Sequence, residues 1–170
     1  MKYEPIVIPE FPKSYDVVKM AVAIDTSGST ARMFTDVIRE TMKQLLDSLI
    51  ASGPFRLTVW SFDNVVQYKT ITEFTERNYA DFEDKIDKIL DQGGGGSSYD
   101  ESFYLVKALC LHPTAMVFVT DAMMGGVNSP ADVIANSFEN YVILLHDSSQ
   151  EKMLPIPFKS HVIPLLYVHD

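Results

Sequence analysis

The chain has 170 residues, the length of one domain, and its 46% hydrophobic and 22% charged composition is that of an ordinary globular protein. Its formal net charge of −9 argues against broad binding to nucleic acid or to anionic membranes, because both need a basic surface. Without a stretch typical of a signal peptide or a membrane span, it is expected to be cytoplasmic. The single cysteine, Cys110, lies in a helical pattern and is expected to be buried.

Apolar runs and helical stripes alternate along most of the chain. Residues 1–16 are expected to form an extended, proline-punctuated arm, and residues 17–170 a single domain. The expected strands, in chain order, are 17–24, 55–62, 65–71, 115–120, 141–145 and 161–168. The expected helices lie around 38–49, 79–90, 99–110 and 130–138.

This alternation predicts an α/β fold in which a mostly parallel six-stranded sheet is covered by helices on both faces. Asp63 and Asn64 predict a tight turn into strand 65–71, which should therefore run antiparallel at the sheet edge. The expected architecture is a Rossmann-like, doubly wound sheet with one antiparallel edge strand.

Polar side chains follow the first buried strand at its carboxyl end. Asp25, Ser27 and Ser29 stand at alternate positions and offer only hard oxygen donors, which suit Mg²⁺, Mn²⁺ or Ca²⁺. Ligands in open α/β sheets bind at this end of the strands. The alternative is a capped helix start, because serine, threonine and aspartate also satisfy the free amides of a helix N-terminus.

Two further loops could contribute oxygen ligands to the same place. Four glycines precede Ser97 and Ser98, and the strand at 115–120 ends in Asp121. In a doubly wound sheet the strands ending at Asp25 and Asp121 should be neighbours. The predicted metal site therefore consists of Asp25, Ser27, Ser29, Ser97 and Asp121, with Ser98 as an alternative to Ser97. A role for Asp63 behind these ligands is less favoured than that of a simple turn aspartate.

The segment Asp25-Thr-Ser-Gly-Ser-Thr resembles the D-x-S-x-S signature of the von Willebrand factor A domain's metal-ion-dependent adhesion site. The glycine run resembles that family's G-G-T loop, and Thr120-Asp121 resembles its strand end in T-D-G. The resemblance implies that Ser27, Ser29 and Ser97 bind Mg²⁺ through hydroxyls, with the two aspartates acting directly or through water. Ala122 departs from the family's usual glycine and should alter the backbone after Asp121.

The resemblance also implies a function in binding rather than catalysis. The cation would attract an Asp or Glu side chain of a protein partner, and an adaptor of a MoxR-type AAA ATPase is one such role. Two alternatives remain: a metal-free scaffold of the same family, and a Mg²⁺-dependent phosphatase resembling the haloacid dehalogenases. The phosphatase is less favoured, because Ser27 occupies the place of its second aspartate.

Overall fold

The computed structural model describes residues 2–3, 17–27, 34–96, 98–122, 126–145, 155–165 and 167–168. Its centre is a six-stranded sheet with the strand order β4-β3-β2-β5-β6-β7, and every neighbouring pair is parallel except the antiparallel β3 and β4. The strands are β2 (Val18–Asp25), β3 (Phe55–Phe62), β4 (Thr72–Thr75), β5 (Ala115–Thr120), β6 (Glu139–Leu145) and β7 (His161–Leu165). A separate two-stranded antiparallel sheet joins β1 (Lys2–Tyr3) to β8 (Tyr167–Val168).

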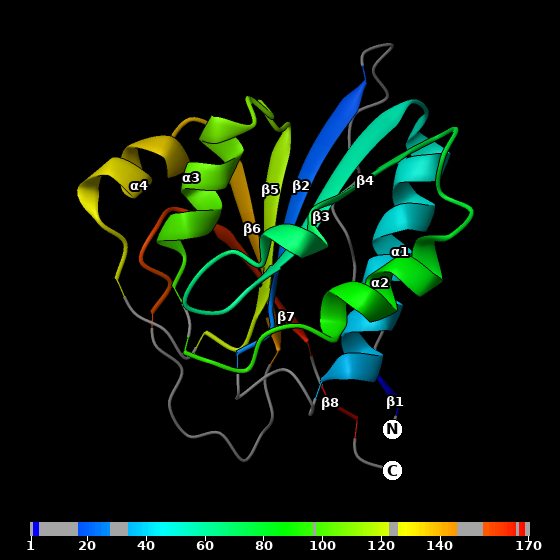
Figure 1. Cartoon of the computed structure of the whole chain (residues 1–170), viewed down its shortest axis with the longest axis horizontal. Helices are drawn as coiled ribbons and strands as arrows, with labels where there is room; N and C mark the ends of the chain where they lie inside the picture. Colours follow the sequence, from blue (N-terminus) through cyan, green and yellow to red (C-terminus); the bar gives the residue numbers. More distant parts are fainter. Residues whose placement is uncertain are drawn as a thin grey trace.

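Helices cover both faces of the sheet (Figure 1). On one side lie α1 (Thr35–Ser52) and α2 (Phe82–Leu90), and on the other α3 (Asp100–Ala108) and α4 (Ser129–Ala135). Each side has its own apolar core, because side chains of successive strand residues point to opposite faces. None of the described helices combines the length and the apolar character needed to cross a membrane.

The central strands β2 and β5 are buried on both faces, as is typical of parallel strands between two helical layers. Val22 and Ile24 pack toward α1 and α2, whereas Ala21 and Ala23 pack toward α3. The small alanines leave room on that face for a cluster of large rings. Its fully buried members include Trp60, Phe62, Tyr99, Phe103 and Phe118.

The third strand was expected at 65–71 but is found at Thr72–Thr75. The predicted turn does form, with an isolated bridge between Phe62 and Val66, but the chain then enters a short 3₁₀ helix, η1 (Tyr68–Thr70). Here the Thr70 hydroxyl accepts a 2.9 Å hydrogen bond from the Ser61 amide, which a strand residue would otherwise satisfy. The hydroxyl therefore interrupts the ladder and delays the strand.

Cys110 was expected to be buried, and this is wrong: it is exposed just beyond the last turn of α3. The amide of Leu111 donates to the Val106 carbonyl, and the Cys110 amide donates to the Lys107 carbonyl. This pattern closes the helix with Cys110 in the left-handed region, at a φ of 49°. The helical stripe therefore ends before it reaches the cysteine.

Candidate functional site

Two aspartates lie at the carboxyl ends of adjacent strands, Asp25 at the end of β2 and Asp121 directly after β5. Both are fully buried, with 0% of their surface exposed. The sequence prediction that these two strand ends are neighbours is consistent with the pairing of β2 and β5. Burial of two carboxylates at one edge is costly unless protons, hydrogen bonds or a cation compensate their charge.

Asp25 is held from two directions. Its Oδ1 accepts a 2.9 Å hydrogen bond from the Ser27 amide, and its Oδ2 accepts a 2.7 Å hydrogen bond from the Thr120 hydroxyl. The Thr120 hydroxyl also accepts from the Ala122 amide at 3.1 Å. One threonine therefore joins the end of β2 to the turn that follows β5.

Burial raises the pKa of Asp25 above its ordinary value of 3.8, and the nearby charge of Asp121 raises it further. The hydrogen bonds from Ser27 and Thr120 act in the opposite direction, because they stabilise the carboxylate. Desolvation is the largest of these effects, so the site favours a neutral carboxyl or a compensating cation.

Tyr99 forms part of the site's floor. It is fully buried immediately before α3, and its ring packs edge-on against Phe118 and Phe158. Burial raises the pKa of the Tyr99 hydroxyl, and the charges of Asp25 and Asp121 raise it further. The phenol therefore remains neutral beside the two aspartates.

A third loop, the glycine run Gly93–Gly96, is anchored to this edge by Asp63, which follows β3. The Asp63 carboxylate accepts hydrogen bonds from the Gly95 amide at 3.3 Å and from the Gln67 side chain at 3.0 Å. The Asp63 carbonyl accepts a 3.0 Å hydrogen bond from the Ser98 amide. Asp63 thus positions the loop as well as its own turn.

The glycine run also approaches the end of β2 closely. A Cβ atom added to Gly93 would lie 2.7 Å from the backbone carbonyl of Thr26, and Gly93 has a φ of +104°. Thr26 is itself tied to β3, since its amide donates a 2.9 Å hydrogen bond to the Phe62 carbonyl. The contact requires glycine at this position.

The structure brings together three of the five predicted site residues: Asp25, Ser27 and Asp121. Ser29 and Ser97 lie outside the described residues, so their proposed role as ligands stays a prediction. Among the residues that the structure describes, no group of three or more histidine, cysteine, aspartate or glutamate side chains is placed to hold a metal ion.

Sequence reasoning missed Thr120 and Tyr99 as parts of the site. Thr120 is the last residue of an apolar strand, and only the knowledge that β2 lies next to β5 places its hydroxyl on Asp25. Tyr99 lies in the stretch 99–110 that was expected to form a helix, and nothing in that pattern marked it as part of the site. Ala122 keeps a left-handed backbone, with a φ of 56°, although it has a side chain.

No protein-family model and no curated protein matches the sequence. Among solved structures, the chain is similar to the PilB minor pilin from Streptococcus sanguinis, with a TM-score of 0.54 and 13% identity over 77% of this chain. Its fold resembles that of a minor pilin. The likeness covers 51% of the minor pilin chain, so this protein spans about half of that length.

A second solved structure contains three N-terminal domains of the type V pili tip protein Mfa5 from Porphyromonas gingivalis. The TM-score is 0.43 and the identity is 14%, with 67% of this chain and 22% of that chain covered. At this score the likeness carries no weight for the fold.

These findings correct the expected membership of the von Willebrand factor A family, together with its adhesion site and its cation-dependent adaptor function. The physical reason is that the motif is short, and its aspartate and serine residues can also form an ordinary hydrogen-bonded turn. In this structure the Ser27 amide donates back to Asp25 two residues earlier, a local turn that needs no metal. The alternatives drawn from that interpretation, a metal-free scaffold of the family and a phosphatase, are set aside with it.

The Rossmann-like classification is also corrected. The six-stranded sheet has the antiparallel edge pair that was expected, but the structural likeness is to a minor pilin rather than to a Rossmann-like protein. Alternating strands and helices satisfy the same packing rules in several folds. The alternation of strands and helices therefore predicted the layers correctly, but it did not distinguish this fold from other folds with the same layers.

Proposed function

We propose that this chain is a non-enzymatic structural domain of a pilus-type assembly, in which a divalent cation stabilises the carboxyl-terminal edge of the sheet. The observation that carries the proposal is the pair of fully buried carboxylates, Asp25 and Asp121, at neighbouring strand ends. The likeness to a minor pilin over most of the chain supports a structural role.

The donor set fits a hard cation. Asp25 and Asp121 supply carboxylate oxygens and Ser27 a hydroxyl, the ligand types that Mg²⁺ and Ca²⁺ bind. Ser29 and Ser97, outside the described residues, are proposed to complete the set. A cation at this edge would compensate the charge that burial otherwise disfavours, which is the same cause that raises the pKa of Asp25.

Such a cation would hold loops rather than activate a substrate. The three loops of this edge follow β2, β3 and β5, and Asp63 already joins the second of them to the glycine run. A cation bound by Asp25 and Asp121 would also join the loops that follow β2 and β5, and so make this edge rigid. A rigid edge suits a domain that has to keep its shape within an assembly.

The test is thermal unfolding of chelator-treated protein with and without Mg²⁺ or Ca²⁺. Millimolar cation should raise the unfolding temperature of the wild type, because a ligand that binds only the native state stabilises it. The rise should disappear in Asp25→Asn and Asp121→Asn but persist in Asp47→Asn, which removes an exposed carboxylate from α1. If neither cation changes the unfolding temperature of the wild type, the proposed cation site is wrong.

The assembly part of the proposal needs a separate measurement. Cells that produce the native protein can be sheared, and an antibody can then locate the chain in the surface or the cytosolic fraction. Recovery in high-molecular-weight material of the surface fraction would support a pilus-type role. Recovery only in the cytosol would reject that role and agree with the location expected from the sequence.

A further inference from the structure

A cavity of about 110 Å³ lies at the amino-terminal end of β2 and β3, beside the end of α3 and far along the strands from the aspartate pair. Its lining is formed by Lys19, Met20, Ala21, Arg56, Thr58, Leu109, Cys110, Leu111 and Pro113. A water molecule occupies about 30 Å³ in the liquid, so the cavity has room for a group such as a carboxylate.

The polar lining of this cavity is basic, although the protein as a whole is acidic. Lys19 is half-buried and Arg56 is exposed, and they stand next to each other in the register of β2 and β3. Arg56 forms a 2.9 Å ion pair with Glu73 of β4, which offsets part of its charge. Lys19 and Arg56 are the charged residues of the lining, so the local charge favours an anion.

Thr58 provides an independent indication of a ligand. It is only 6% exposed, and it lies two residues after Arg56 on the same face of β3. No hydrogen bond of its hydroxyl is found within the described part of the chain, and the oxygen is not among the fully enclosed atoms without a partner, so it opens onto the cavity. A polar group bound in the cavity could supply the missing partner.

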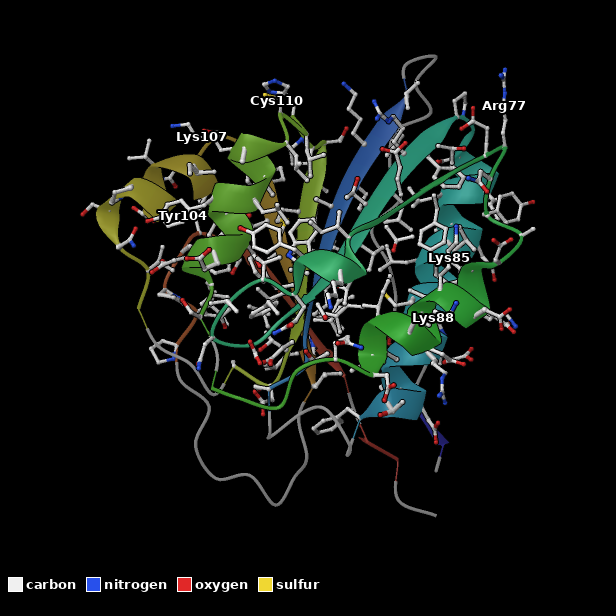
Figure 2. The ribbon with its side chains drawn as sticks, in the orientation of Figure 1. Arg77, Lys85, Lys88, Tyr104, Lys107 and Cys110 are labelled. Atoms are coloured by element: carbon white, nitrogen blue, oxygen red, sulfur yellow. The ribbon has the colours of Figure 1, made fainter. Side chains whose placement is uncertain are left out.

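Cys110 lines the cavity just beyond the last turn of α3. Figure 2 shows it at the same end of this helix as Lys107. Its thiol is exposed. The left-handed backbone at Cys110 closes the helix and turns the chain toward Pro113, which also lines the cavity. The only thiol of the protein therefore borders a basic cavity.

We propose that this cavity binds the carboxylate of an anionic disulfide, of the glutathione class, and thereby directs the disulfide to Cys110 for formation of a mixed disulfide. Lys19 and Arg56 attract the carboxylate, and Thr58 donates a hydrogen bond to it. The remainder of the molecule lies outside, because the cavity is too small to enclose it.

The reaction is a thiol–disulfide exchange. The Cys110 thiol loses its proton to solvent, and its sulfur attacks one sulfur of the disulfide. A new bond joins Cys110 to that sulfur, and the other half of the reagent leaves as a thiolate with the electron pair of the broken bond. The small disulfide is the oxidant, so no further reactant is required.

The test compares the reaction of Cys110 with anionic dithiobis(nitrobenzoate) and with neutral dithiodipyridine. Both release coloured products, and Cys110 is the single cysteine, so every signal reports on it. The ratio of the two rates is divided by the ratio for an uncharged small thiol, which removes the intrinsic reactivity of the reagents. We expect the wild type to favour the anionic reagent.

Charge variants then separate the cavity from general attraction. Lys19→Gln and Arg56→Gln should each lower the normalised ratio about three-fold, within the range of a partly exposed ion pair. Glu73→Gln should raise it, because Arg56 loses its ion-pair partner. Lys107→Gln is the matched control, since it removes an exposed charge three residues from Cys110 that is not part of the lining.

A normalised ratio near one in the wild type would overturn the proposal, as would a loss in Lys107→Gln equal to that in Lys19→Gln. Circular dichroism of each variant checks that the fold is kept. If Lys19→Gln does not fold, the variants at the exposed positions Arg56 and Glu73 still test the proposal, because Arg56→Gln should lower the normalised ratio and Glu73→Gln should raise it. With glutathione disulfide, mass spectrometry should detect the adduct in the wild type and none in Cys110→Ser.

Discussion

The Thr120 hydroxyl donates a 2.7 Å hydrogen bond to the carboxyl group of Asp25, across the boundary between β5 and β2. Both residues are fully buried, and 95 positions separate them in the sequence. The same hydroxyl accepts from the Ala122 amide, so the bond also orients the turn next to Asp121. The geometry of the aspartate pair therefore depends on a residue that carries no charge.

Replacing Thr120 with valine should destabilise the protein by about 1–3 kcal/mol, the cost of leaving buried hydrogen-bonding groups without their partner. Valine keeps the shape of threonine but cannot donate to Asp25 or accept from the Ala122 amide. The free energy of unfolding from urea titration at neutral pH measures the effect. Thr120→Ser is the matched control: it should lose less than Thr120→Val, and an equal loss would show that the methyl group matters rather than the hydroxyl.

Asp25→Asn should change how stability depends on pH. Burial raises the pKa of Asp25 in the folded protein above its ordinary value of 3.8, so the native state binds this proton more tightly than the unfolded chain. Stability from this group is therefore fully present below pH 3.8 and is lost as the pH rises through the folded-state pKa. In cation-free buffer Asp25→Asn should lack this loss and be more stable than the wild type at neutral pH.

The asparagine can keep both hydrogen bonds, since its Oδ1 can accept from the Ser27 amide while Thr120 turns its hydroxyl to accept from the new amide. Urea unfolding over a pH series, in the presence of a chelator, measures the difference. Parallel stability curves for wild type and variant would show that Asp25 does not titrate in this way.

Asp63→Ala should loosen the glycine run without unfolding the domain. The Asp63 carboxylate accepts from the amides of Gly95 and Val65 and from the Gln67 side chain, and alanine leaves all three donors without it. We expect a loss of about 1–2 kcal/mol and faster hydrogen exchange at Gly95. Exchange at the Val22 amide in the central strand is the internal reference. Equal acceleration at both amides would indicate global destabilisation instead.

Particular residues show how far the sequence determines this fold. Apolar runs located β2, β3, β5 and β6 closely, because strands buried on both faces have few alternatives. The hydrogen bond from the Ser61 amide to the Thr70 hydroxyl could not be predicted. In it, the side chain of a residue nine positions later takes the place of a backbone partner from a neighbouring strand. The same limit applies to the site: Asp25 and Asp121 stand at recognisable strand ends, but the role of Thr120 depends on strand order.

The family resemblance failed for a related reason. Its motifs consist of Asp, Ser and Gly, residues that also make turns and caps in proteins without a metal. The Asp25 to Ser27 turn and the anchoring of the glycine run by Asp63 are such local uses. Short polar motifs thus located a buried, organised edge of the sheet, while the identity of the fold depended on the whole arrangement of strands and helices.

Gly93 provides a direct test of whether this edge needs its close packing. A Cβ atom at Gly93 would lie 2.7 Å from the backbone carbonyl oxygen of Thr26. The backbone of Thr26 is fixed to β3, because its amide donates a hydrogen bond to the Phe62 carbonyl. Gly94 has a similar backbone, with a φ of +123°, but nothing lies within 4 Å of its added Cβ.

Both alanine variants therefore incur the strain of a positive φ, about 1–2 kcal/mol, whereas Gly93→Ala alone must also push the glycine run away from Thr26. We expect Gly93→Ala to lose at least about 1 kcal/mol more than Gly94→Ala in urea unfolding, since relieving such overpacking typically costs 1–3 kcal/mol. Gly93→Ala should also abolish any stabilisation by added Mg²⁺, because the loop that carries Ser97 would be displaced. Equal losses in the two variants would mean that the loop relaxes freely, and that the packing against Thr26 is not needed to build this edge.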